Sequence, residues 1–384
     1  MVERRITPMS LSSDTSLGAF SAGCLLGAGC LLGLALANLR ELRALCMKRT
    51  RKADPSFVPI ISSNEFIERH RARRKAAPDP GYFALYSSWI GGIVTDPALM
   101  QVPLDDHMVH RGHAVFDTAS LVDGRIYRME PHLDRLFFSA SRARIKLPFS
   151  RERMREVIEQ TCSASGQTTA SIRFWLSTGP GDFGFLPDGC IEPCFYVMVF
   201  KGIPIDKNLE LQGVSEYTVT GVPMKPPALA TIKSNNYLLN CLTAMESKDK
   251  GGRFGILLGD DGLIAESCVL NVAFVTPDNV FITPTFKKIL AGVTVRKVLE
   301  LAQKMVKEGK LRKVEQRDIR YEEARTAKEM FLLGGDTHLI PVVNWDDIPV
   351  GTGEVGPLFK DLLAQLEKDK LLGFKDHQAV RYVH

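Results

Sequence analysis

The sequence contains no C-x-x-C pair, and none of its eight cysteines stands at metal-ligand spacing from a histidine. Low-complexity tracts and internal repeats are also absent, so the composition is that of an ordinary globular protein. We therefore expect no structural metal, and we expect buried free thiols in a reducing compartment. The cysteines are Cys24, Cys30, Cys46, Cys162, Cys190, Cys194, Cys241 and Cys268.

Charge is distributed unevenly along the 384 residues. The first 80 residues carry 13 Lys or Arg against 7 Asp or Glu, whereas the rest of the chain is nearly balanced. The formal net charge of +5 therefore belongs to the N-terminal extension. It gives no support for nucleic-acid binding by the main body.

Between Asp14 and Arg40 the chain has no charged residue, and residues 17–39 form an apolar run rich in glycine and alanine. This run is long enough for a membrane-spanning helix, which needs about 20 residues. A basic cluster follows it, so the positive-inside rule places the main body in the cytosol. We expect a membrane anchor. The alternatives are a signal or targeting segment, cleaved on import into a mitochondrion or plastid, and a buried core helix.

The remaining sequence divides by composition and periodicity. Residues 1–53 form the extension, residues 54–81 a polar linker with a short helix near 65–74, and residues 82–205 a smaller α+β domain. Residues 206–350 form a larger second domain, and residues 351–384 a C-terminal helix and tail. Strands and helices alternate without βαβ regularity, which predicts a two-domain α+β fold rather than a Rossmann sheet.

Several elements are predicted with their ends. Asp123-Gly124 separates two strands, 115–122 and 125–129, and is a strong β-hairpin signal. Pro131 opens a helix whose apolar face holds Leu133, Leu136, Phe137 and Ala140. Further helices are expected at 151–163, 294–308 and 356–369, and strands at 171–177, 194–200, 254–259, 269–276, 280–283, 330–335 and 340–345.

The stretch from Pro226 to Met245 holds a single charged side chain, Lys233. Apolar residues at helical spacing follow (Leu238, Leu239, Leu242 and Met245), so the lysine precedes a helix or lies on its first turn. A lysine in apolar surroundings becomes a better nucleophile, because loss of solvation disfavours the charged ammonium. Tyr237, four residues on, would lie on the same helical face and bring a phenol beside the amine. A solvent-reaching lysine on a half-buried helix is the structural alternative.

Three other features accompany this lysine. Glu266 follows a hairpin turn beside an apolar strand, and Gly292-Val293-Thr294 enters a helix whose N-terminus can bind a phosphate. Arg135 lies off the apolar face of its helix and can supply a second, bidentate phosphate contact. Each has an ordinary structural explanation alone. Together they are the groups that hold pyridoxal phosphate: a Schiff-base lysine, a carboxylate for the pyridine nitrogen and a phosphate site.

The sequence resembles the class-IV (fold-type IV) pyridoxal-phosphate enzymes, which include branched-chain and D-amino-acid aminotransferases and 4-amino-4-deoxychorismate lyases. The resemblance covers about residues 83–370, and it is closest to the plant-type D-amino-acid aminotransferase group. It rests on HRGHAVFDT (110–118), EPHLDRLFFSASRARI (130–145), ATIKSNNYLLN (230–240), IAESCVLNVAFV (264–275), LAGVTVRKVLELA (290–302) and EMFLLGGDTHLIPV (329–342).

The resemblance implies roles for particular residues. Lys233 would bind the cofactor, Glu266 would contact the pyridine nitrogen, and Tyr237 would lie near the 3-oxygen. Arg135, Val293 and Thr294 would hold the phosphate, helped only by backbone amides at Gly334-Gly335, where many relatives have hydroxyls. The Arg-x-His carboxylate trap of bacterial D-amino-acid aminotransferases is missing from STGPGDFG. Phe116 and Arg173 are the substrate-contact candidates, although a structural strand arginine is the alternative for Arg173.

The resemblance therefore implies an aminotransferase acting on small amino acids and 2-oxo acids. A lyase releasing pyruvate and 4-aminobenzoate uses the same cofactor groups, and a catalytically inactive membrane-tethered scaffold is the alternative from another class. The family also implies a homodimer with active sites near the interface. In support, the loop GPGDFGFLPDG exposes apolar residues (Phe183, Phe185 and Leu186) that a solitary loop would not favour, unless they fold back onto their own domain.

Overall fold

The computed structural model describes residues 58–79, 81–202, 206–335, 338–371 and 376–382. Residues 64–384 form one compact unit, and residues 1–63 are assigned to another. The apolar run at 17–39 lies outside the described residues, so the expected membrane anchor is untested. Within the described ranges, no helix is both long enough and apolar enough to cross a bilayer.

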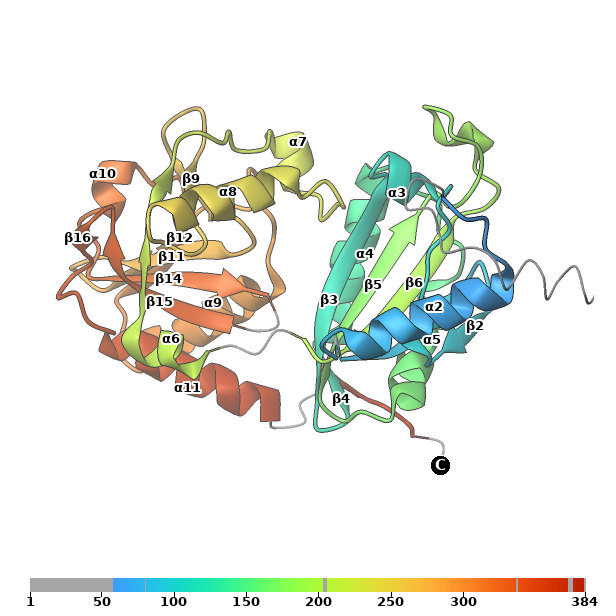
Figure 1. Ribbon diagram of the computed structural model, residues 1–384. Coiled ribbons are helices and arrows are strands. Elements are labelled where there is room, and N and C mark those ends of the chain that lie inside the picture. Colours follow the sequence, from blue (N-terminus) through green and yellow to red (C-terminus); the bar gives the residue numbers. More distant parts are fainter. Residues whose placement is uncertain (1–57, 80, 203–205, 336–337, 372–375, 383–384) are drawn as a thin grey trace, which may run out of the picture. The chain divides into compact units, whose positions relative to one another are not determined.

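The first half of the compact unit is built on a seven-stranded antiparallel sheet in the order β17-β4-β3-β5-β6-β1-β2 (Figure 1). Helices α4 (Met129–Arg142) and α5 (Arg151–Ser165) pack on one of its faces. The strands are β1 (Tyr82–Ser87), β2 (Gly92–Val94), β3 (Ala114–Val122), β4 (Arg125–Tyr127), β5 (Ala170–Ser177), β6 (Cys194–Phe200) and β17 (His377–Ala379).

Strand β3 shows how the sequence pattern directs this packing. Val115, Ala119 and Leu121 point into the core beneath the helices, so Phe116 and Thr118 point to the opposite face. The Asp123-Gly124 turn has positive φ at both residues, 48° and 71°, as a tight hairpin requires. The predicted hairpin is therefore confirmed.

The second half contains a larger sheet in the order β13-β12-β11-β14-β15-β16, with β7 paired to β15, and a small sheet β10-β9-β8. Helices α9 (Val293–Lys307) and α11 (Pro357–Leu371) pack together against the larger sheet (Figure 1). The strands are β7 (Val214–Glu216), β8 (Thr218–Val219), β9 (Ile256–Leu258), β10 (Ile264–Ser267), β11 (Asn271–Val275), β12 (Val280–Thr283), β13 (Lys313–Gln316), β14 (Glu329–Gly334), β15 (His338–Trp345) and β16 (Ile348–Pro349).

The other described helices lie outside the two helix layers or are short. They are α2 (Ser63–Ala76), α3 (His107–His110), α6 (Lys207–Gln212), α7 (Pro227–Ala230), α8 (Leu238–Asp249), α10 (Tyr321–Ala324) and the 3₁₀ turns η1 (Pro97–Leu99) and η2 (Pro187–Gly189).

The mixed α+β class and most predicted elements are confirmed, with a few corrections. Helix α4 begins two residues before Pro131, which is tolerated because a proline in the first turn costs no hydrogen bond. The predicted helix after Lys233 is confirmed as α8, whose apolar residues Leu238, Leu242 and Met245 are exposed. The five cysteines in the described part of the chain are free thiols, but Cys241 is exposed. The domain boundaries remain predictions.

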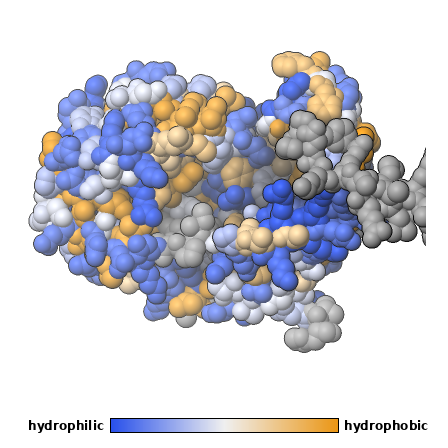
Figure 2. All heavy atoms as spheres, in the orientation of Figure 1, coloured by the Kyte–Doolittle hydropathy of each residue, from blue (hydrophilic) through white to orange (hydrophobic). Residues whose placement is uncertain are grey.

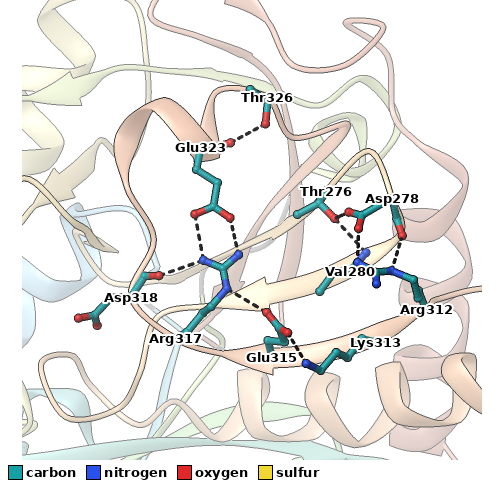
Figure 3. A network of polar contacts seen from close by, with 10 residues as sticks. All are labelled: Thr276, Asp278, Val280, Arg312, Lys313, Glu315, Arg317, Asp318, Glu323 and Thr326. Atoms are coloured by element: carbon teal, nitrogen blue, oxygen red, sulfur yellow. Dashed lines mark hydrogen bonds and ion pairs between the residues drawn. The ribbon is translucent and has the colours of Figure 1, made fainter.

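A polar network covers the edge strand β13 of the larger sheet (Figure 3). Arg317 contacts Glu315 and forms a bidentate pair with Glu323, while Arg312 pairs with Asp278. Arg312 and Asp278 are exposed, and Arg317, Glu315 and Glu323 are partly exposed, so solvent screens each pair and its contribution to stability is small. Charged groups along an edge strand do, however, discourage pairing with another chain.

Glu329 ties β14 to the start of α11, and this contact leads to a stability prediction. Its buried carboxylate accepts hydrogen bonds from the amides of Leu358 and Phe359, at 3.1 and 2.8 Å. Glu329→Ala leaves these amides unsatisfied and should lower the free energy of unfolding by about 1–3 kcal/mol in urea denaturation. Glu322→Ala, at an exposed position, is the control. Equal stabilities of the two variants would contradict the prediction.

Candidate active site

Lys233 lies in an irregular segment between α7 and α8, as expected for a lysine just ahead of a helix. Backbone bonds fix this segment along the end of β3: the amide of Phe116 donates to the carbonyl of Lys233 at 2.9 Å, and the amide of Asn235 donates to Ala114 at 3.0 Å. The amide of Lys233 donates to Ser139 Oγ on α4 at 3.2 Å. The lysine is therefore held from two sides by its backbone.

The side chain of Lys233 meets two aromatic rings. Its Nζ lies 3.1 Å from the hydroxyl of Tyr237 and 4.6 Å from the ring centroid of Phe116. The prediction of a phenol beside the amine is confirmed, but the reason given for it, a shared helical face, is wrong. Residues 233–236 are not helical and Tyr237 is the N-cap of α8, so the two groups do not share a helical face.

Glu266 lies on β10, a strand whose separate existence the sequence did not reveal. Its Oε2 accepts a hydrogen bond from the amide of Leu290 at 3.3 Å. Burial raises the pKa of the Glu266 carboxyl to about 7, and the Leu290 amide, Lys225 and Lys233 oppose the rise only in part. This carboxyl is consequently suited to gain or lose a proton near neutral pH.

Lys225 is a second amine at this site that the sequence did not single out. Its Nζ lies 4.7 Å from the ring centroid of Tyr237, the ring that also faces Lys233. Burial lowers the pKa of Lys225, while the charge of Glu266 raises it. Lys225 precedes the double proline, just outside the stretch that drew attention to Lys233, so no sequence signal separated it from an ordinary loop lysine.

The turn at Leu290–Gly292 connects Glu266 to the start of α9. Asn271 on β11 donates to the carbonyl of Leu290 at 2.9 Å, and Glu266 accepts from the amide of the same residue. A Cβ on Gly292 would lie 2.1 Å from Asn271 Oδ1, so glycine is required there. The N-cap residue of α9, Gly292, has no side chain that could cap the helix, and the first residues Val293 and Thr294 are buried. This helix N-terminus can therefore bind an anion.

Arg135 on α4 reaches the same turn. Its Nη1 donates to the carbonyl of Ala291 at 3.4 Å. Its Nε and Nη2 donate to the fully buried carboxylate of Asp117, at 2.8 and 2.7 Å, and His132 Nδ1 lies 2.8 Å from that carboxylate. Asp117 occupies the Nε and Nη2 edge of the guanidinium, so one N–H each of Nη1 and Nη2 remains for a phosphate, and the bidentate contact stays a prediction.

Asp117 and His132 were missed as site residues, although both fall in the motifs quoted above. The charge of Arg135 holds the pKa of the Asp117 carboxyl well below its usual range despite burial. Burial lowers the pKa of His132, which favours the neutral imidazole. Asp117 lies between Val115 and Ala119, which point inward, so the alternation of side chains along β3 places it under α4. Alternation alone does not identify Arg135 as its partner.

The two substrate candidates lie together on the other face of the sheet. Thr118 and Arg173 are directly paired across β3 and β5, and Arg173 Nε donates to Thr118 Oγ1 at 3.0 Å. The guanidinium carbon of Arg173 lies 5.4 Å from the ring centroid of Phe116. Phe116 thus connects Arg173 with Lys233. Gly335 is at an open position with a φ of 52°, and no described contact joins it to these residues.

The chemical groups of this site are complementary to the three groups of pyridoxal phosphate that a protein must bind. An amine is available for a carbonyl group, a desolvated carboxyl for a ring nitrogen, and an uncapped helix N-terminus beside an arginine for a phosphate. The donor set therefore fits pyridoxal phosphate.

The chain belongs to the class-IV aminotransferase family. A family model described as "Amino-transferase class IV" matches residues 114–345. The chain is 43% identical over 337 residues to the "D-amino-acid transaminase, chloroplastic" of Arabidopsis thaliana, which covers 87% of this chain and 88% of the relative. The predicted resemblance is confirmed. The protein is an aminotransferase that depends on pyridoxal phosphate.

More distant relatives agree with this assignment. A "Putative branched-chain-amino-acid aminotransferase" of Methanocaldococcus jannaschii is 29% identical, covering 71% of this chain and 93% of its own length. The solved branched-chain amino acid aminotransferase of Escherichia coli superposes with a TM-score of 0.69 at 23% identity. The match covers 78% of this chain and 100% of that structure, which shows the shared fold.

The raised pKa of Glu266 predicts a pH-dependent stability for the cofactor-free protein. Because its pKa in the folded state is about 7 and its ordinary value is 4.5, the folded state holds this proton more tightly. The associated stability is present below about pH 4.5 and is lost as the pH rises through 7. Glu266→Gln should remove this loss when unfolding in urea is compared at pH 5 and 8. Glu322→Gln is the exposed control, and parallel profiles for wild type and Glu266→Gln would refute the assignment.

Proposed function

We propose that the enzyme moves the amino group of a small α-amino acid, with small D-amino acids as the first choice, to a 2-oxo acid. The observation that carries the proposal is the amine of Lys233, 3.1 Å from the Tyr237 hydroxyl at a site shared with Glu266. The names of the relatives support the substrate class. Bound pyridoxal phosphate supplies an electron sink for the pair released when the substrate loses its α-proton.

Lys233 is proposed as the catalytic residue. Its amine would hold the cofactor covalently, and it would accept and return the proton of the substrate α-carbon. Tyr237 stabilises the amine through the contact between Nζ and its hydroxyl. Its phenol would lie near the 3-oxygen of the cofactor. Phe116 and the Tyr237 ring limit water around Nζ, which strengthens these polar interactions.

Glu266 is proposed to hold the ring nitrogen of the cofactor. A carboxylate beside this nitrogen favours its protonated form, and the ring then accepts electrons more readily. The amide of Leu290 fixes one oxygen of Glu266, leaving the other for the ring nitrogen. Glu266 thereby orients the cofactor and tunes its electronics.

The phosphate is proposed to lie between Arg135 and the N-terminus of α9. The remaining N–H groups of Arg135 and the amides of Val293 and Thr294 are the donors, with Gly335 contributing only a backbone amide. Asp117 is a positioning residue, because it fixes the guanidinium from behind through two hydrogen bonds.

Phe116 and Arg173 are proposed to contact the substrate. Arg173 lies on the face of β5 that it shares with Phe116, so its charge can attract a carboxylate close to Lys233. Its hydrogen bond to Thr118 holds the guanidinium near the sheet.

A paired assay tests this function. D-alanine and L-leucine, each with 2-oxoglutarate, are compared with aminodeoxychorismate, and we expect glutamate formation to exceed release of 4-aminobenzoate, with D-alanine the better donor. Lys233→Ala should reduce turnover at least a thousandfold, in the range that removal of a nucleophilic residue produces, whereas Lys248→Ala, at an exposed position on α8, should not. Faster 4-aminobenzoate release would make the protein a lyase, and an active Lys233→Ala protein would exclude Lys233.

The working unit is proposed to be a homodimer. The loop after β5 exposes Phe183, Phe185 and Leu186 by 60%, 82% and 60%, and α8 exposes Leu238, Leu242 and Met245. Figure 2 shows hydrophobic surface over α7 and α8 and on this loop. The ring centroids of Phe183 and His110 also lie 4.9 Å apart, so part of the loop folds back onto its own half of the molecule.

Sedimentation tests the dimer. Phe185→Asp places a charge on the most exposed of these loop residues and should shift the protein toward monomers at micromolar concentration, with loss of activity. Leu371→Asp is the control, since it adds the same charge at an exposed apolar position, at the end of α11. A wild-type protein that is monomeric and fully active would exclude the dimer.

The N-terminal extension is proposed to direct the enzyme to an organelle, with a membrane anchor as the other possibility. The Arabidopsis relative named as chloroplastic supports a plastid. Fusion of residues 1–57 to a fluorescent protein separates the two: an imported and shortened fusion indicates targeting, and a full-length membrane-bound fusion indicates an anchor.

A further inference from the structure

A cluster of five polar residues joins the two halves of the compact unit away from the amine of Lys233. It consists of Tyr127, Arg128, Lys297, Glu300 and Asp369, here called the clamp. These residues come from four places: the end of β4, the residue before α4, the second turn of α9 and the last turns of α11. None of them carries a role in the proposed chemistry.

Asp369 is the centre of the clamp. Its Oδ2 accepts a hydrogen bond from the hydroxyl of Tyr127 at 2.7 Å, and its Oδ1 lies 2.7 Å from Lys297 Nζ. Asp369 and Tyr127 are both buried. Burial and the Asp369 carboxylate raise the pKa of Tyr127 far above its ordinary value, so the phenol remains a donor. A buried carboxylate needs such partners, which makes the bonds costly to break.

Arg128 extends the clamp to the start of α4. It is a buried N-cap in the left-handed conformation, with a φ of 51°, and its Nη2 lies 3.3 Å from Glu300. Its Nη1 lies 3.7 Å from Asp376, next to β17, whose residue His377 pairs with Tyr127 in the first sheet. A non-glycine residue keeps this conformation only when its surroundings hold it there.

The clamp and the proposed phosphate site lie on the same two helices. Arg128 immediately precedes α4, and Arg135 follows it by seven residues, within that helix. Lys297 follows Val293 by four residues, which places them on one face of α9. The two helices are therefore linked twice, by Arg135 and Ala291 at the phosphate site and by Arg128 and Glu300 in the clamp.

We propose that the clamp is a positioning site: it fixes the spacing of α4 and α9 and thereby sets the affinity for the phosphate group of the cofactor. This inference rests on the proposed location of the phosphate between Arg135 and the N-terminus of α9. Donors placed on two separate helices bind one anion well only when their spacing is held to within a fraction of an ångström. The C-terminal helix, through Asp369, thus acts on cofactor retention without touching the cofactor.

Equilibrium binding of pyridoxal 5'-phosphate and of pyridoxal, which lacks the phosphate, tests the clamp. With the full-length protein freed of cofactor, Tyr127→Phe and Asp369→Asn should each weaken the phosphate compound by about fivefold to tenfold, in the range of coupling between sites. Pyridoxal binding should remain within about twofold of wild type. Because pyridoxal needs a folded site, its binding also shows that each variant is intact.

Two further variants make the outcome decisive. Tyr321→Phe removes a comparable bond, from the Tyr321 hydroxyl to Asp346 at 2.9 Å, within the second half of the molecule, and should leave both affinities unchanged. Arg135→Lys should weaken the phosphate compound selectively, as the proposed phosphate site requires.

The two possible failures are distinguishable. Equal loss of both compounds in Arg135→Lys would refute the phosphate site, and with it the clamp's role. If Arg135→Lys is selective but Tyr127→Phe and Asp369→Asn weaken both compounds equally, or neither, the positioning role of the clamp is overturned while the phosphate site stands.

Discussion

The buried pair of Asp117 and Arg135 is the interaction on which the candidate site depends. A buried carboxylate is costly unless its partners are fixed, and removing one partner of such a pair costs about 3–5 kcal/mol. Here the carboxylate accepts two bonds from Arg135 and has His132 beside it, which locks α4 against β3. The same guanidinium reaches Ala291, so the pair also links the first half of the molecule to the start of α9.

The two faces of strand β3 carry both the buried ion pair and a residue that contacts Lys233. Asp117 points beneath α4, while its neighbour Phe116 points to the opposite face and covers the amine of Lys233. The backbone of β3 also holds the segment that carries Lys233. A shift of β3 by one residue would exchange these faces and destroy both contacts. The register that buries the apolar residues of β3 therefore also fixes the geometry of the site.

Local patterns predicted much of the fold and the principal groups of the site. The Asp-Gly hairpin, the buried face of α4 and the position of Lys233 ahead of α8 follow from turn chemistry and periodicity. Asp117, Lys225 and the return of β17 to the first sheet did not follow, because each depends on contacts between distant segments. The spacing of the apolar residues of α8 predicted the helix, but it did not reveal that Leu238 and Met245 are exposed.

Locating the cofactor on the chain tests the central claim most directly. The protein is saturated with pyridoxal 5'-phosphate, reduced with borohydride and digested, and the modified lysine is identified by mass spectrometry. We predict a phosphopyridoxyl group on Lys233 and none on Lys225, although Lys225 Nζ lies only 4.7 Å from the ring centroid of Tyr237. Modification of Lys225, or of another lysine, in place of Lys233 would contradict it.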